Sequence, residues 1–177
     1  IFSGIVAALR YIRKHKVIHN DIKPANIVYI KGKVAKLLDF GLARPGPYTY
    51  HASGSPWYTP PELLNDGFRG FASDVWALGI VMLYVYGIFS LPDLSSGWAI
   101  KDAVLKNPQS ENEKDKRART AHEKWLAKVE ETRKNLPKDD PPLAIVAQML
   151  HNLPSERIKI RDLNASLSAA LRSLPLS

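Results

Sequence analysis

Hydrophobic residues recur at helical spacing over the first sixteen positions of the chain. The members of this stripe lie three or four positions apart and are Ile5, Ala8, Leu9 and Ile12. Such spacing predicts an amphipathic core helix over residues 1–16. Its basic end suits the partial negative charge of a helix C-terminus.

A second stretch, residues 75–86, is apolar on all sides. A helix of this composition has to be buried on every face, so we expect it at the centre of the core. Ser73 and Asp74 precede it and are predicted to be its N-cap pair. The longer apolar run over residues 75–91 is interrupted by Gly79 and Gly87 and is too short to cross a bilayer, so we expect no membrane segment.

Shorter patterns predict the remaining elements. Residues 27–30 and 34–38 are apolar runs around a Lys-Gly-Lys turn, which predicts a small β-hairpin. Residues 42–55 are rich in Gly, Pro, Ser, Thr and Tyr, which indicates a surface loop without regular structure. Further helices are expected over residues 60–64, 98–106, 143–150 and 164–174, with a break and cap at 139–142 and another helix start at 157–163.

Charged residues of both signs dominate residues 111–140. Trp125, Leu126 and Val129 fall on one side of this stretch, which predicts a lightly packed amphipathic helix. It is either a solvated helical insertion or a dedicated surface for a partner.

The composition fits a soluble globular chain. Its 177 residues suit one domain or a large piece of one, and 45% hydrophobic with 24% charged residues allows a core. The absence of cysteine excludes disulfides and thiolate chemistry within this sequence.

The net charge of +8 is concentrated near the N-terminus, where nine basic residues among the first 44 face only Asp21 and Asp39. A nucleic-acid partner is disfavoured, because aromatic residues are not interleaved with these charges. Attraction of a polyanionic nucleotide or an acidic substrate is the simpler inference.

Between the first helix and the hairpin lies a polar segment that a simple turn would not require. Residues 19–26, the 19–26 loop, read His-Asn-Asp-Ile-Lys-Pro-Ala-Asn, and Asp-Phe-Gly follows at 39–41. This order resembles the catalytic and magnesium-binding loops of protein kinases. Residues 54–62 resemble that family's Ala-Pro-Glu segment, 73–79 its central helix and 149–158 its end-of-domain pattern.

The resemblance implies a mainly α fold (α+β) with a small β-hairpin. It corresponds to the C-terminal, large lobe of the kinase domain over residues 1–174. Typical family members are shorter between about 107 and 141, so this region is expected to be a charged helical insertion. The implied activity is transfer of the ATP γ-phosphate to serine or threonine hydroxyls of protein substrates, with ATP and Mg²⁺ as cofactors.

Site roles follow from the resemblance, position for position. Asp21 is the expected catalytic base, and Lys23 the expected contact to the transferring phosphate. Asn26 and Asp39 are the expected metal ligands, since magnesium demands oxygen donors. Val28 is expected in the floor beneath the adenine. Lys23 is followed by proline, which matches the serine/threonine branch of the family.

Other matches have structural roles. His19 and Phe40 are expected to pack together, and Glu62 is expected to form a buried ion pair with Arg157. Asp74 resembles the aspartate that hydrogen-bonds the backbone of the 19–26 loop, besides its role as a cap. Ser55, where the serine/threonine branch usually has threonine, would support Asp21 and Lys23.

Asn20 departs from the family pattern, because many kinases have arginine there. That arginine pairs with a phosphate on the activation loop, so we expect a non-RD kinase whose loop needs no phosphorylation for its active shape. Hydroxyl groups that could still be modified lie at Tyr48, Thr49, Tyr50 and Ser53.

No glycine-rich loop and no Val-Ala-Ile-Lys strand precede the first helix, and the chain starts inside an apolar pattern. We therefore expect a fragment that lacks the N-terminal kinase lobe, its missing partner, and that binds ATP poorly by itself. An intracellular location, in the cytoplasm or nucleus, is expected, with any targeting segment outside this fragment.

Two alternatives remain open. A pseudokinase or interaction module would keep the fold without turnover, although it would not need all four polar residues. A small-molecule phosphotransferase of the same broad fold shares His-x-Asp and a metal-binding aspartate. The Pro-Pro-Glu segment at 60–62, which shapes a shelf for peptides, favours a protein substrate.

Overall fold

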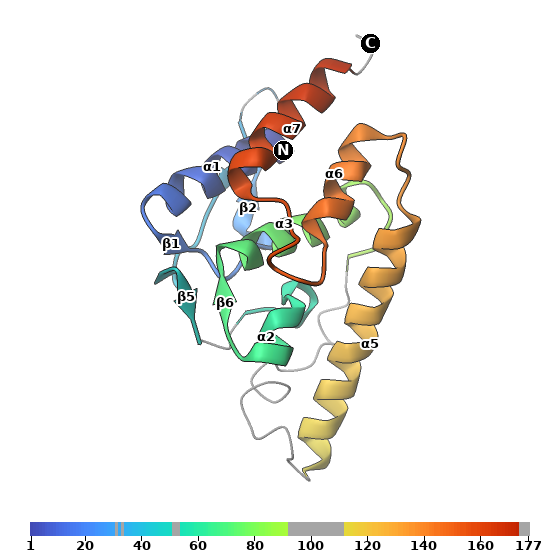
Figure 1. The fold of residues 1–177 in the computed structure, drawn as a ribbon. Helices are drawn as coiled ribbons and strands as arrows, with labels where there is room; N and C mark the ends of the chain where they lie inside the picture. The colour runs from blue at the N-terminus through green and yellow to red at the C-terminus, as the bar shows by residue number, and fades with distance from the viewer. Residues whose placement is uncertain (31, 33, 51–53, 92–111, 174–177) are drawn as a thin grey trace.

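The computed structural model describes residues 1–30, 32, 34–50, 54–91 and 112–173 (Figure 1). The helices are α1 (Phe2–Lys14), α2 (Pro61–Asp66), α3 (Phe71–Val85), α5 (Glu113–Asn135), α6 (Pro141–Met149) and α7 (Ile160–Ser173), with 3-10 turns η1 (Pro24–Asn26) and η2 (Pro56–Tyr58). The strands are β1 (Val17–Ile18), β2 (Ile27–Val28), β3 (Lys36–Leu37), β4 (Arg44–Pro45), β5 (Tyr48–Thr49) and β6 (Arg69–Gly70). The expectation of a mainly helical chain with little strand is confirmed. The helix expected over 98–106 lies outside the described residues.

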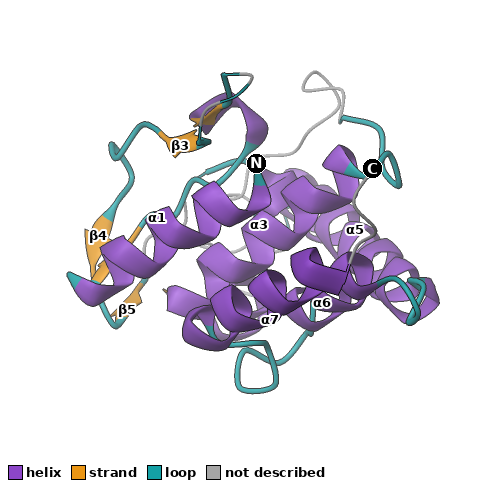
Figure 2. Ribbon diagram, turned by 90° about the horizontal axis from the view of Figure 1, so that it is seen from above, coloured by secondary structure: helices purple, strands orange, loops and turns teal. Residues whose placement is uncertain are grey.

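Helix α3 forms the centre of the core. Every residue from Ser73 to Leu83 is buried, which confirms the expectation from its all-round apolar composition. Figure 2 shows α1, α6 and α7 gathered with α3 and the short strands β3, β4 and β5 along one edge. None of the described helices is both long enough and apolar enough to cross a membrane.

The predicted N-cap of this helix is wrong. Helix α3 begins at Phe71, and Gly70 occupies the cap position. The Gly70 amide donates to the Ser73 hydroxyl at 3.0 Å, so Ser73 lies within the first turn. Asp74, one residue further, is buried and faces the 19–26 loop instead of the helix end.

The strands pair as three separate antiparallel ribbons within the described part of the chain. Strand β2 pairs with β3, with Ile27 opposite Leu37, which confirms the predicted hairpin. The segment 42–55 was expected to lack regular structure, and this is wrong: β4 pairs with β1, and β5 pairs with β6. Both partners are distant in sequence, so local composition gave no sign of them.

Glycine allows the hairpin to approach α1. A Cβ atom built on Gly4 would lie 2.8 Å from the carbonyl oxygen of Ala35 and from the Val34 side chain. Such distances are too short for any real Cβ contact, so a larger residue would push the hairpin away.

The C-terminal part differs from the expectation in two places. Residues 157–163 and 164–174 were predicted as a helix start and a separate helix, but one helix, α7, runs from Ile160 to Ser173. Helix α5 was expected to pack lightly, yet His122 and Val129 are fully buried and Trp125 is nearly so. The expected cap at Asp140 is confirmed, because its carboxylate accepts the Leu143 amide at 3.0 Å.

A buried ion pair joins α2 to the turn between α6 and α7. The two terminal nitrogens of Arg157 donate to the two carboxylate oxygens of Glu62, each at 2.9 Å. Arg157 also donates to three backbone carbonyls, those of Ala72, His151 and Asn152. The predicted pair is therefore confirmed, and it fixes two segments separated by 95 positions.

Loss of one partner of this pair should be costly. We expect Arg157→Met to lower the free energy of unfolding by about 3–5 kcal/mol, because Glu62 is left buried without its counter-charge. The measurement is chemical denaturation, with the exposed Arg161→Met as the control. The double variant Glu62→Gln with Arg157→Met should lose less than the sum of the two single changes. A loss from Arg157→Met no larger than the control's would contradict this role.

Candidate active site

The backbone of the 19–26 loop is held by the carboxylate of Asp74. Its two oxygens accept the amides of His19 at 2.8 Å and of Asn20 at 3.0 Å. Burial raises the pKa of Asp74 to about 6, against the lowering effect of these two bonds and of Arg69. The expected bond from Asp74 to the loop backbone is thus confirmed, and it anchors the loop to the most buried helix.

The imidazole of His19 connects the loop to the end of the hairpin. Its Nε2 donates to the carbonyl of Leu38 at 3.1 Å, and its Nδ1 accepts the amide of Asp21 at 3.3 Å. The ring is fully buried, and burial lowers the pKa of His19, so the neutral form that these two bonds require is favoured. Phe40 packs edge-on against it at 4.8 Å between ring centroids, as predicted.

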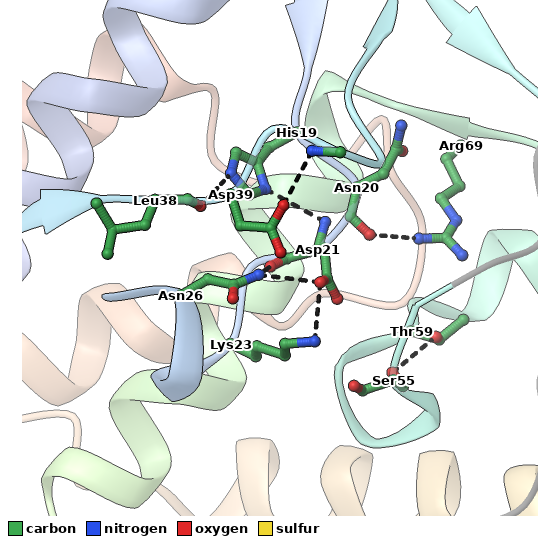
Figure 3. A network of polar contacts seen from close by, with 11 residues as sticks. His19, Asn20, Asp21, Lys23, Asn26, Leu38, Asp39, Ser55, Thr59 and Arg69 are labelled. Atoms are coloured by element: carbon green, nitrogen blue, oxygen red, sulfur yellow. Dashed lines mark hydrogen bonds and ion pairs between the residues drawn. The ribbon is translucent and has the colours of Figure 1, made fainter. Parts of the chain in front are cut away.

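Asp21 contacts two other predicted site residues, Lys23 and Asn26, directly (Figure 3). The amide nitrogen of Asn26 donates to the carbonyl of Asp21 at 2.8 Å and to its Oδ2 at 2.9 Å. Lys23 forms an ion pair with the same Oδ2 at 2.8 Å. Both Asp21 and Asn26 are buried, whereas Lys23 is partly exposed.

The fourth residue, Asp39, comes from the far end of the hairpin. Figure 3 shows its carboxylate facing Asn26 and Asp21. One oxygen accepts the amide of Gly41 at 3.0 Å, which closes a tight turn with Asp39 at a φ of 58°. Aspartate tolerates this left-handed conformation better than most residues. The hairpin therefore brings together two carboxylates that lie 18 positions apart in the sequence.

The donor set suits magnesium. The amide nitrogen of Asn26 is committed to Asp21, which leaves its amide oxygen to serve as a ligand. Asp39 keeps a second carboxylate oxygen beyond the one bound to Gly41. Magnesium takes such hard oxygen donors, together with water and phosphate oxygens. Among the described residues, no group of three or more His, Cys, Asp or Glu side chains that could hold a metal occurs.

Two further predicted residues lie at the margins of this cluster. Val28, the expected floor of the adenine site, is 40% exposed on β2. Ser55 lines the same small cavity as Asp21, and its carbonyl accepts the Thr59 hydroxyl at 3.2 Å. Of the loop hydroxyl residues, Tyr48 and Tyr50 are exposed and Thr49 is half-buried, while Ser53 lies outside the described residues.

Asn20 links the 19–26 loop to the segment after Asp-Phe-Gly. Its side-chain amide donates to the carbonyl of Leu42 at 3.1 Å, and its φ of 66° is a left-handed conformation that asparagine adopts readily. The backbone carbonyl of Asn20 accepts a hydrogen bond from Nη1 of Arg69 at 2.9 Å.

Arg69 is the residue that sequence reasoning missed. It is buried, and burial lowers the pKa of its guanidinium to about 10, although Asp74, Asp21 and Glu62 raise it. In the sequence, this single arginine between Phe68 and Gly70 belongs to no recognisable motif. Only the pairing of β5 with β6 places it beneath the 19–26 loop.

With this geometry established, comparison with known proteins identifies the class of protein. Residues 1–167 match the family described as the protein kinase domain, and the chain belongs to the protein kinase family.

Several individual relatives of the chain are named as protein kinases. The chain is 38% identical over 85 residues to the probable serine/threonine-protein kinase MARK-A of Dictyostelium discoideum, which covers 46% of this chain and 8% of the relative. It is 38% identical over 95 residues to the SNF1-like protein kinase ssp2 of Schizosaccharomyces pombe, covering 51% and 16%. It is 37% identical over 100 residues to the serine/threonine-protein kinase stk11 homolog of Dictyostelium discoideum, covering 52% and 17%. The matches thus span less than a fifth of each of these relatives.

The anchoring role of Asp74 can be tested by hydrogen exchange. In Asp74→Asn one acceptor oxygen becomes a donor, so one of the two loop amides loses its partner in a buried position. We expect the amides of His19 and Asn20 to exchange about tenfold faster or more, since an unmade buried bond costs about 1–3 kcal/mol. Asp66→Asn, an exposed change at the end of α2, is the control. Unchanged exchange at both amides would rule out the anchor.

Proposed function

We propose that residues 1–174 form the large lobe of a serine/threonine protein kinase, which transfers the γ-phosphate of ATP to hydroxyl groups of protein substrates. The observation that carries the proposal is the contact of Asp21 with Lys23 and Asn26, with Asp39 facing them (Figure 3). A catalytic unit of this kind also needs a small lobe over the nucleotide, so the tests below use the full-length protein.

Asp21 is the group that accepts the proton of the substrate hydroxyl. Its Oδ2 is occupied by Lys23 and Asn26. Its Oδ1 faces Gly54, where a Cβ atom would lie 3.6 Å away. The hydroxyl would therefore meet Oδ1 beside Gly54, attack the γ-phosphorus and release ADP, while its proton passes to Asp21.

Lys23 has a second partner when nucleotide binds. Its ammonium lies 2.8 Å from Asp21 and is partly exposed, so a short movement of a flexible side chain would bring it to a phosphate oxygen. There it offsets negative charge on the transferring group.

Asn26 and Asp39 are the residues that would hold magnesium, and their oxygen donors fit it. When bound, the ion supplies positive charge to the phosphates of ATP. The exposed side chain of Val28 on β2 would contribute an apolar surface for the adenine.

The segment at 54–62 favours a protein substrate over a small molecule. Gly54 adopts a φ of 99°, and a Cβ there would lie 3.2 Å from the carbonyl of Asn20, so the segment passes close against the 19–26 loop. The residues that follow are buried from Tyr58 to Leu63, and the ion pair of Glu62 fixes their end. A buried and anchored segment beside the base suits a peptide lying across it.

The catalytic assignment predicts the effect of two substitutions. With Mg²⁺-ATP and a mixed pool of serine and threonine peptides, Asp21→Asn and Asp39→Asn should each lower kcat at least about 100-fold, because positioning and charge neutralisation supply most of the catalysis. Asp162→Asn, an exposed carboxylate on α7, is the matched control. Turnover preserved in both site variants would refute the assignment. Phosphorylation of aminoglycosides or choline in place of peptides would favour the small-molecule alternative.

The activation segment is proposed to reach its active shape without phosphorylation. Asn20 replaces the arginine that would bind a phosphate, and its amide already binds the carbonyl of Leu42. The pairings of β4 with β1 and of β5 with β6 hold the following residues in place.

Alanine substitutions test this proposal. Thr49→Ala and Ser53→Ala in the full-length protein should keep kinase activity within about twofold, since no guanidinium at position 20 would read a phosphate there. Ser55→Ala is measured alongside, because loss there would instead report support of Asp21 and Lys23. Collapse of activity in Thr49→Ala or Ser53→Ala would contradict the proposal.

A further inference from the structure

The turn η2, which follows Gly54 and Ser55, packs against helix α5. The indole nitrogen of Trp125 donates to the carbonyl of Trp57 at 3.0 Å. The two indole rings also meet edge-on, with centroids 5.1 Å apart and planes at 90°. Trp125 is 8% exposed, so this contact is nearly dry. A hydrogen bond and an aromatic contact between the same two residues define one relative position.

Helix α3 holds the same turn from its other side. Tyr58 packs against Tyr84 at 5.9 Å, Tyr84 against Phe89 at 6.1 Å, and Phe89 against Trp125 at 5.3 Å. Together with Trp57, these residues form a closed aromatic cluster: Trp57, Tyr58, Tyr84, Phe89 and Trp125. The cluster joins α5 to the central helix through η2.

The backbone hydrogen bonds within the turn are few, so its position depends on the residues packed against it. It has three residues, and the hydrogen bonds within it run from the Tyr58 amide to the Ser55 carbonyl and from the Thr59 amide to the Pro56 carbonyl, each at 3.1 Å. Short 3-10 turns have poor hydrogen-bond geometry and take their position from their surroundings. Ser55 lies directly before the turn and lines the cavity that contains Asp21. A shift of Trp57 would therefore move the segment that faces the catalytic carboxylate.

Helix α5 comes from the charged stretch that the sequence left as either a solvated insertion or a partner-binding surface. Figure 1 shows it running along the side of the molecule next to α2. Its buried residues Asp115, Ala118, His122, Trp125 and Val129 recur along one face. Burial lowers the pKa of His122 to about 4, and Arg69 acts in the same direction. The His122 side chain is therefore uncharged at neutral pH and packs within the core. The helix is therefore an integral support of the shelf.

We infer that Trp125 is a positioning residue for the peptide-binding shelf at 54–62, acting through Trp57. This inference rests on the proposed kinase function. The substrate that it concerns is a peptide that carries the serine or threonine to be phosphorylated. Trp125 does not touch the reacting atoms, and its effect is on how well the peptide is held. ATP binding, which involves the opposite side of Asp21 through Lys23, Asn26 and Asp39, does not depend on it.

The kinetic test uses the full-length protein with Trp125→Phe, which keeps an aromatic ring and removes the donor to Trp57. With the mixed serine and threonine peptide pool as probe, the peptide KM should rise about threefold to tenfold, as expected for one lost hydrogen bond. The KM for ATP should stay unchanged. Val129→Ala is the matched control: it creates a cavity one turn further along α5 at a fully buried residue. An equal rise of the peptide KM in Val129→Ala would reduce Trp125 to a general structural role and overturn the inference.

A second measurement does not depend on turnover. Hydrogen exchange at the amides of Tyr58 and Thr59 should accelerate in Trp125→Phe and stay at the wild-type rate in Val129→Ala. Unchanged exchange in Trp125→Phe would overturn the inference whatever the kinetics give. If the wild-type protein phosphorylates no peptide at all, the proposed function fails, and the exchange result alone decides whether Trp125 positions the turn.

Discussion

The bond between the Asp74 carboxylate and two backbone amides is the contact on which the rest of the site depends. A buried carboxylate is costly, as its raised pKa shows, and two amides together with the nearby guanidinium of Arg69 offset that cost. These bonds fix the positions of His19 and Asn20 relative to α3, the most buried helix of the fold. Asp21 follows these two residues directly. A contact between residues more than fifty positions apart therefore sets the place of its side chain.

The same helix also holds the segment 54–62 beside the 19–26 loop. Ser73, next to Asp74, donates its hydroxyl to Glu62 at 2.8 Å, and Glu62 in turn binds Arg157. Tyr84, further along α3, packs against Tyr58 of η2. A single buried helix thus holds the 19–26 loop at its beginning and the shelf along its length. Asp21 and the segment 54–62 consequently keep a fixed relation, which the proposed transfer would require.

The charged helix α5 shows why composition is a poor guide to packing. Only a few of its residues are apolar, yet these few, led by Trp125, bury against η2 and Phe89. Its lysines, arginines and glutamates cover the outward face, where ion pairs such as Glu130 with Arg133 form. A narrow apolar stripe is enough to dock a long polar helix, because each large aromatic side chain buries a large area.

The sequence by itself determined the helices α1 and α3 and the hairpin, and it predicted Asp21, Lys23, Asn26 and Asp39 as a set, because periodicity and ordered motifs are local properties. It misplaced the start of α3, since Ser73 lies in the first turn and accepts the Gly70 amide, while Asp74 binds the 19–26 loop. Tertiary structure alone decided the pairings of β4 and β5, the burial of Arg69 under the 19–26 loop, and the hydrogen bond and ring contact of Trp125 with Trp57. Each of these contacts joins residues far apart in the chain, and no local pattern specifies which distant partner a strand, a guanidinium or an indole will meet.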